Sequence, residues 1–199
     1  KDGRVHGWCY VEQRMYLYQE WPTERIPDGC SPVELTPADL TSDGYLDLDL
    51  LMARLPDGID TIVLQVGQGV GKTVLAGEWA RRLDAEGLRV VGVAPTRSLS
   101  RALSEVLGLP CYLDITQRML PDSTTVCLPS LYRARVIEAT ESAVVDHPID
   151  LLVLDESEQQ IRSLAGRHLT DPEAIKARCA LLARIQSSGR VLALDADAC

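Results

Sequence analysis

Apolar and polar residues follow two alternating patterns along this chain, and together the patterns predict an α/β fold. Five short, mainly apolar runs predict strands at 61–66, 89–94, 124–128, 150–154 and 190–194. Between them, apolar residues recur at every third or fourth position, which is typical of amphipathic helices. Strands and helices that alternate in this way form a parallel sheet with helices on both faces. The run at 150–154 is apolar after its first residue, so we expect that strand at the centre of the sheet.

The predicted helices have recognisable signals at their ends. They are expected at 46–55, 75–83, 99–107, around 130–139 and from 172 to 189. Gly87 and Gly108 follow the second and third of these segments, and glycine often ends a helix. Asp171 can cap the last helix, where Pro172 takes the first helical position.

Residues 1–30 differ in character from the rest of the chain. The segment from Val5 to Tyr18 is rich in aromatic and β-branched residues, which predicts two short strands joined by a turn. Prolines and a glycine then interrupt the chain before residue 31. We therefore expect 1–30 to be a short β-rich extension, or the tail of a preceding domain, and 31–199 to be the main domain.

The segment after the first predicted strand has the pattern of a phosphate-binding loop. Its residues are Gly67, Gln68, Gly69, Val70, Gly71, Lys72 and Thr73. Glycines allow successive backbone N–H groups to point at one anion, and the following helix adds its positive dipole end. Lys72 would reach the β- and γ-phosphates of a nucleotide, and the Thr73 hydroxyl would hold Mg²⁺. Val66 stands where the strict pattern has a small residue, and the alternative interpretation is a glycine-rich turn that binds nothing.

Two carboxylates follow the most apolar predicted strand. Asp155 could hold Mg²⁺ through its water shell, opposite Thr73. Glu156 could orient and deprotonate the water that attacks the γ-phosphate. The alternative is that the pair is only the solvated start of a helix. In parallel sheets, ligands bind at the carboxyl ends of strands, so we expect both elements to share one site.

Thr96 and Arg97 lie where the second predicted strand ends and a helix begins. A hydroxyl, a guanidinium and backbone N–H groups at such a point suit a phosphodiester backbone. Taken alone, the same residues would be an ordinary helix start.

Charge and cysteine usage restrict the classes of partner and compartment. The net charge of −9 argues against a protein that coats nucleic acid, although a motor can grip a strand through a few loop residues. The six cysteines form no C-x-x-C pair, so we expect a reduced intracellular compartment, in the cytoplasm or elsewhere. No apolar run approaches the roughly 20 residues that span a bilayer, and we expect neither a membrane partner nor a signal peptide.

Four elements occur in the order and approximate spacing of helicase motifs I, Ia, II and III. They are the phosphate loop, Pro-Thr-Arg-Ser-Leu at 95–99, Asp-Glu-Ser-Glu-Gln at 155–159 and Leu-Asp-Ala-Asp-Ala at 194–198. Residues 60–198 resemble the first RecA-like domain of superfamily 2 helicases. The sequences at 155–159 and 194–197 are similar to those of the origin-binding and plasmid or phage replication branch. Val-Cys-Leu-Pro-Ser-Leu at 126–131 is similar to the segment that this branch has between motifs Ia and II.

The resemblance implies a role for each motif. ATP and Mg²⁺ would be bound by the phosphate loop, with Asp155 as the metal ligand and Lys72 and Glu156 as the catalytic residues. Thr96, Arg97 and Ser130 would contact the nucleic-acid backbone, DNA in preference to RNA. Asp195 and Asp197 would couple the nucleotide state to movement of the strand. A second RecA-like domain would supply an arginine finger.

The leading expectation is the ATP-binding and hydrolysing motor domain of a DNA helicase or translocase that works in replication. The chain opens on Lys1 and stops at Cys199, directly after a strand-like segment, so we expect a piece of a larger protein that hydrolyses ATP poorly alone. One alternative is a phosphate-loop ATPase that acts on protein partners, such as a partition or remodelling factor, which the negative charge favours. Another is a degenerate nucleotide-binding interaction module, for which Val66 is the only indication.

Overall fold

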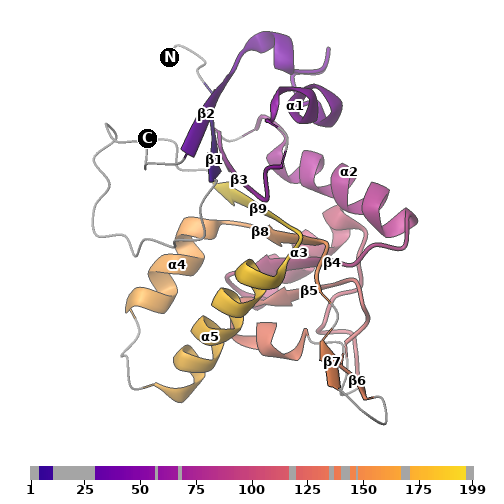
Figure 1. The fold of residues 1–199 in the computed structure, drawn as a ribbon, viewed down its shortest axis with the longest axis vertical. Helices are drawn as coiled ribbons and strands as arrows, with labels where there is room; N and C mark the ends of the chain where they lie inside the picture. The colour runs from indigo at the N-terminus through magenta and orange to yellow at the C-terminus, as the bar shows by residue number, and fades with distance from the viewer. Residues whose placement is uncertain are drawn as a thin grey trace.

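The structure is a computed structural model that describes most of the chain (Figure 1). The described residues are 5–10, 30–56, 58–66, 69–116, 120–134, 137–139, 144–146, 148–166 and 171–195. Within them, a seven-stranded sheet forms the centre of the fold, with strand order β2-β1-β3-β9-β8-β4-β5.

Five neighbouring strands of this sheet are parallel, and they correspond to the five predicted runs. They are β3 (Thr61–Gln65), β9 (Arg190–Asp195), β8 (Leu151–Leu154), β4 (Val90–Ala94) and β5 (Thr124–Cys127). All side chains of β8 are buried, and β8 is the middle strand of the five. The predictions of an α/β fold, a parallel sheet and a central 150–154 strand are confirmed.

Two antiparallel strands extend the sheet beyond β3. β1 (Val5–Tyr10) pairs with β3 on one side and with β2 (Cys30–Leu35) on the other. The second strand predicted before Tyr18 falls in 11–29, outside the described residues. The strand that pairs with β1 instead begins at Cys30, so the expected division at residue 30 falls within β2.

Helices cover both faces of the sheet, as the alternating pattern predicts (Figure 1). The α-helices are α1 (Leu48–Arg54), α2 (Lys72–Ala85), α3 (Arg97–Leu107), α4 (Ser157–Gly166) and α5 (Pro172–Ser187). A short 3₁₀ helix, η1 (Pro37–Asp39), follows β2. Buried residues of α1, α2 and α3 share one apolar core, whereas those of α4 and α5 belong to a second core.

The alternation of side chains along β8 explains why there are two cores. Leu151 and Val153 pack into the core beneath α2 and α3, and Leu152 and Leu154 pack into the core beneath α5. Successive side chains of a strand point to opposite faces, so a continuously apolar strand contributes to both layers.

The end signals of the last predicted helix are confirmed. The Asp171 carboxylate accepts a hydrogen bond from the backbone N–H of Glu173 at 3.0 Å, and Pro172 is the first residue of α5. The helix α4 is additional to those predicted.

The helix predicted around 130–139 is wrong. Its first part is a 3₁₀ helix, η2 (Leu128–Arg133), which ends when the Ala134 N–H bonds to the Leu131 carbonyl three residues earlier. Its last part is a strand, β6 (Ile137–Ala139), paired antiparallel with β7 (Val144–Asp146). The residues predicted to form one helix therefore belong to a tight turn and to a separate hairpin.

Candidate functional site

Three adjacent strand ends bring the candidate nucleotide-binding residues together. The phosphate loop follows β3, Asp155 and Glu156 follow β8, and Asp195 is the last residue of β9. β9 lies between β3 and β8 and pairs with both in parallel. The lysine-bearing loop and the paired acids therefore lie at the same edge of the sheet, separated by one strand.

The described part of the loop has the backbone conformation that glycine permits. Gly69 and Gly71 have φ values of 86° and 81°, in the left-handed region, and Gly71 is the N-cap of α2. The Lys72 side chain is buried, and its Nζ donates a hydrogen bond to the Val66 carbonyl at 3.3 Å. The ammonium group thus reaches back to the residue that follows β3, and Thr73 comes directly after Lys72 in the first turn of α2. Gly67 and Gln68 are outside the described residues.

Tyr45 lies against the loop, and the sequence analysis did not single it out. A Cβ atom placed on Gly71 would be 2.7 Å from Cδ1 of Tyr45, so the ring contacts the glycine directly. The next residue, Leu46, donates its N–H to the Val70 carbonyl at 2.9 Å, which fixes this segment to the loop. The Tyr45 side chain is nevertheless 45% exposed.

The pKa of Asp155 is shifted by burial and by three charged neighbours, Glu156, Lys72 and Asp195. Burial and then the negative charge of Glu156 raise the pKa of Asp155 to about 6; Lys72 lowers it and Asp195 raises it further. These groups follow or end β3, β9 and β8, which are neighbours in the sheet. The lysine of the loop and the carboxylates that follow β8 and β9 therefore form one electrostatic cluster.

Asp195 connects the two halves of the cluster. One carboxylate oxygen accepts hydrogen bonds from the Glu158 N–H at 3.0 Å and from the Ser157 hydroxyl at 3.5 Å, at the start of α4. Its backbone carbonyl accepts from the Val66 N–H at 3.4 Å, where β3 leads into the loop. The residue therefore contacts both the loop and the acid-pair turn. Asp197 is outside the described residues.

Gln160 supports the turn that carries the acids. Its Nε2 donates to the carbonyl oxygens of Asp155, at 2.7 Å, and Val93, at 2.9 Å. Glu156 has φ of 51°, a left-handed conformation that costs about 1–2 kcal/mol for a residue with a side chain. Gln160 lies one residue beyond the acidic element quoted at 155–159, and no pattern in the sequence predicted this role.

The donor set fits a magnesium ion only if a ligand completes it. Among the described residues, no three His, Cys, Asp or Glu side chains lie close enough together to hold a metal ion. Asp155 and the Thr73 hydroxyl could supply two oxygens, and phosphate oxygens would have to supply others. Burial and then the neighbouring carboxylates raise the pKa of Asp155, and a bound divalent cation would offset both effects.

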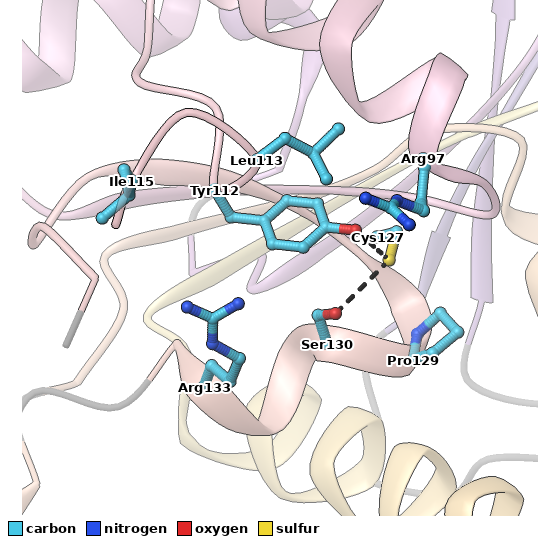
Figure 2. A pocket seen from close by; sticks show the side chains of 8 residues that line it. All are labelled: Arg97, Tyr112, Leu113, Ile115, Cys127, Pro129, Ser130 and Arg133. Carbon is cyan, nitrogen blue, oxygen red and sulfur yellow. Dashed lines mark hydrogen bonds between the residues drawn. The ribbon is translucent and has the colours of Figure 1, made fainter. Parts of the chain in front are cut away.

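The candidate nucleic-acid residues lie at the neighbouring strand ends, β4 and β5. The Thr96 hydroxyl caps α3 by accepting from the Leu99 N–H at 3.3 Å. Arg97 and Ser130 line one pocket of about 420 Å³, together with Tyr112 and Arg133 (Figure 2). The structure thus brings Arg97 and Ser130 together, whereas Thr96 is not among the residues that line the pocket.

The fold and the site define an α/β protein in which a glycine-rich loop and a cluster of acids converge at one edge of a parallel sheet. No protein-family model matches this chain, and none of the curated proteins is detectably similar to it. None of the helices in the described ranges has the length and apolar character needed to cross a membrane. Of the cysteines whose side chains are described, Cys111, Cys127 and Cys179 are all free thiols.

Proposed function

We propose that this chain is the ATP-binding and hydrolysing domain of a nucleic-acid motor, a DNA helicase or translocase. One observation carries the proposal: the lysine-bearing loop and the acid pair follow β3 and β8, which are separated only by β9, so both lie at the same edge of the sheet. A triphosphate lying between them would contact the ammonium group and, through Mg²⁺, the carboxylate. The motif resemblance supports a role in replication.

Each residue of the cluster then has a distinct task. The loop N–H groups and Lys72 would bind the phosphates, and Thr73 and Asp155 would hold Mg²⁺, which would supply positive charge beside the phosphates. Glu156 orients the attacking water and accepts its proton. Asp195, which contacts both the loop and the start of α4, transmits the state of the nucleotide between them.

Partners follow from the rest of the proposal. Nucleic acid would lie across the ends of β4 and β5, and a second RecA-like domain would supply an arginine finger to the γ-phosphate. The free thiols of Cys111, Cys127 and Cys179 support a reduced intracellular compartment.

Tyr45 would contact the base of the nucleotide. Its half-exposed ring beside Gly71 offers a flat apolar surface at the loop. We expect Tyr45→Ala to weaken ATP binding several-fold while inorganic triphosphate binds as before, whereas Tyr45→Phe retains both affinities. Equal losses for the two ligands would show that the ring only supports the loop.

The central test measures ATP binding and single-turnover hydrolysis, with and without a single-stranded DNA. Lys72→Ala should lower ATP affinity about tenfold or more, because a charge-assisted contact is lost. Glu156→Gln should retain binding and lower turnover about 10²- to 10⁴-fold. Glu158→Gln, two residues away, and the exposed Lys176→Ala are matched controls and should leave both quantities unchanged.

A Lys72→Ala variant that hydrolyses ATP like the wild type would refute every enzymatic version of this proposal. The net charge of −9 favours a second candidate, a phosphate-loop ATPase that acts on protein partners. That candidate predicts hydrolysis that depends on Lys72 and Glu156 but does not respond to DNA. Binding of ATP without any turnover would instead indicate a nucleotide-binding interaction module.

A further inference from the structure

Gln160 lies in the first turn of α4, four residues after Glu156, and ties the acid-pair turn to a neighbouring strand. Its side chain is 1% exposed, and its Nε2 donates to the Asp155 carbonyl at 2.7 Å and to the Val93 carbonyl at 2.9 Å. The Val93 carbonyl also accepts from the Asp155 N–H at 2.9 Å. The amide group therefore fastens the turn that follows β8 to β4, a strand in which every residue is buried.

The same residue holds both peptide groups that flank Glu156. The Asp155 carbonyl belongs to the peptide group before Glu156, and it accepts from the Gln160 side chain. The Glu156 carbonyl belongs to the peptide group after it, and it accepts from the Gln160 backbone N–H at 3.1 Å. Because φ and ψ of Glu156 are the only soft torsions between these two planar groups, their orientations set both angles. Gln160 thus determines the backbone conformation of Glu156.

That conformation of Glu156 is an unfavourable one. Within the described residues, Glu156 is the only residue other than glycine with a positive φ, 51°. A residue with a side chain keeps such a conformation only where the surrounding structure enforces it, and such residues cluster at functional sites. The value of φ also sets the direction in which the side chain leaves the backbone. The hydrogen bonds of Gln160 therefore restrict where the Glu156 carboxylate can reach.

The amide of Gln160 is itself incompletely bonded. Its Oε1 is buried and has no hydrogen-bond partner among the residues that the structure describes. A buried acceptor without a partner is unfavourable, and a methionine of similar length would avoid it. Turning the amide over would not help, because Oε1 would then face two carbonyl oxygens, which are acceptors only. The glutamine therefore suits the contacts that its Nε2 makes with the turn, rather than stability alone.

We propose that Gln160 is a positioning residue for ATP hydrolysis, which acts by holding Glu156 in its left-handed conformation. In this conformation the Glu156 carboxylate is directed at the attacking water. Without the two hydrogen bonds of the amide, the turn relaxes to a negative φ and the carboxylate moves away. The inference rests on the proposed function, in which Glu156 accepts the proton of that water.

The first experiment compares Gln160→Met with Gln159→Met in ATP binding and single-turnover hydrolysis. Methionine matches the length of glutamine but cannot donate, so the core stays filled while both side-chain hydrogen bonds are lost. Gln160→Met should lower turnover about 10- to 100-fold, since a misplacement of about 1 Å can cost that much, and should change ATP affinity by less than about threefold. Gln159 is exposed on the same helix, and Gln159→Met should change neither quantity.

A double-mutant cycle separates positioning from structural support. If Gln160 acts through Glu156, adding Gln160→Met to Glu156→Gln should lower the remaining turnover by less than about twofold. A merely structural role would instead lower it by the same factor in both backgrounds. That additivity, or wild-type turnover in a folded Gln160→Met variant, would overturn the inference and leave the proposed function intact. A wild-type protein that does not bind or hydrolyse ATP would overturn both.

The backbone of Glu156 gives a readout that does not depend on turnover. The three-bond coupling between its amide and α protons, measured by NMR, reports φ and should change in Gln160→Met but not in Gln159→Met. An unchanged coupling in a folded Gln160→Met variant would exclude the positioning role. If Gln160→Met does not fold, Gln160→Asn takes its place with the same expected results, because its amide is one methylene too short to reach both carbonyls.

Discussion

Asp155 has an unfavourable charge in the folded protein, and its neighbours only partly compensate for it. Burial is the main cause and Glu156 the next, while Lys72 acts in the opposite direction. A pKa of about 6 means that the carboxylate is mostly ionised at neutral pH, at a cost in folding free energy. Sites that must attract a cation often carry such a cost, because the arrangement suits the bound state rather than the free one.

We predict that Asp155→Asn stabilises the protein at pH 7 in the absence of Mg²⁺ and nucleotide. The difference between the usual pKa of 3.8 and about 6 corresponds to roughly 3 kcal/mol as an upper value. The folded state binds the extra proton, so the wild-type free energy of unfolding should fall as pH rises from about 4 to about 6, and the variant should lack this decrease. Urea unfolding at pH 4, 5, 6 and 7 measures both quantities.

Asp84→Asn, on the exposed surface of α2, serves as the control and should change stability by no more than about 0.5 kcal/mol at any pH. Wild-type and Asp155→Asn proteins of equal stability at pH 7 would contradict the prediction.

The sequence identified residues whose chemistry is carried by a local pattern. Lys72, Asp155 and Asp195 follow apolar strands, so their positions at strand ends could be predicted. Tyr45 and Arg133 could not, because the first acquires its place through Leu46 bonding to Val70 and the second through stacking on Tyr112, contacts that no spacing in the sequence encodes.

At the scale of elements, helices α2 and α3 cross at Gly77. A Cβ at this position would be 2.4 Å from the Val106 carbonyl oxygen, which also accepts a hydrogen bond from Arg81 Nη1 at 3.0 Å. The close crossing therefore fixes the direction of α2, which begins at the phosphate loop, relative to α3, which begins at Arg97.

We predict that Gly77→Ala destabilises the protein by about 1–3 kcal/mol, because the methyl group must push the helices apart. Alanine is favoured over glycine within a helix by about 1 kcal/mol, so the expected sign is opposite to that of helix propensity. Chemical denaturation measures the change, with Asp84→Ala on the same helix as a control of little effect. A variant more stable than the wild type would show that the crossing tolerates the methyl group.

Element predictions succeeded where end signals and periodicity agreed, as in α5. They failed at 130–139 because the apolar spacing there is compatible with a helix although the chain forms a 3₁₀ turn and a hairpin. β2 was also missed, since Pro32 breaks its pattern; a proline is tolerated there because β2 is an edge strand of the described sheet, paired only with β1.

At the scale of the whole molecule, β1 and β2 cover the edge of the parallel sheet. Without β1, the backbone of β3 would have a partner on one side only, in β9. Exposed strand edges pair readily with other chains. The N-terminal strands therefore protect the strand that leads into the phosphate loop.

We predict that a variant without residues 1–35 associates into larger species than the full chain, or unfolds at a lower temperature, because the β3 edge is open and the buried Leu35 is lost. Size-exclusion chromatography with light scattering and thermal unfolding measure the two effects. The same association state and the same midpoint as the full chain would show that the edge needs no cover.

The fold class could be predicted from the sequence, but the order of the strands could not. Alternating apolar runs indicate a parallel sheet. Nothing in their spacing shows that the last strand in the sequence, β9, lies in the sheet between β3 and β8. That insertion is set by long-range packing, through which Ile62 and Leu64 of β3 share a core with Leu192 and Leu194 of β9.

The insertion of β9 also affects how the protein is made. During synthesis, β3 and β8 leave the ribosome before β9, and although β3 can pair with β1 and β8 with β4, neither can pair with β9 until residue 195 has emerged. A nascent chain would thus carry the glycine loop and the acid pair without the strand that joins them. The complete candidate site would therefore assemble only in a late step.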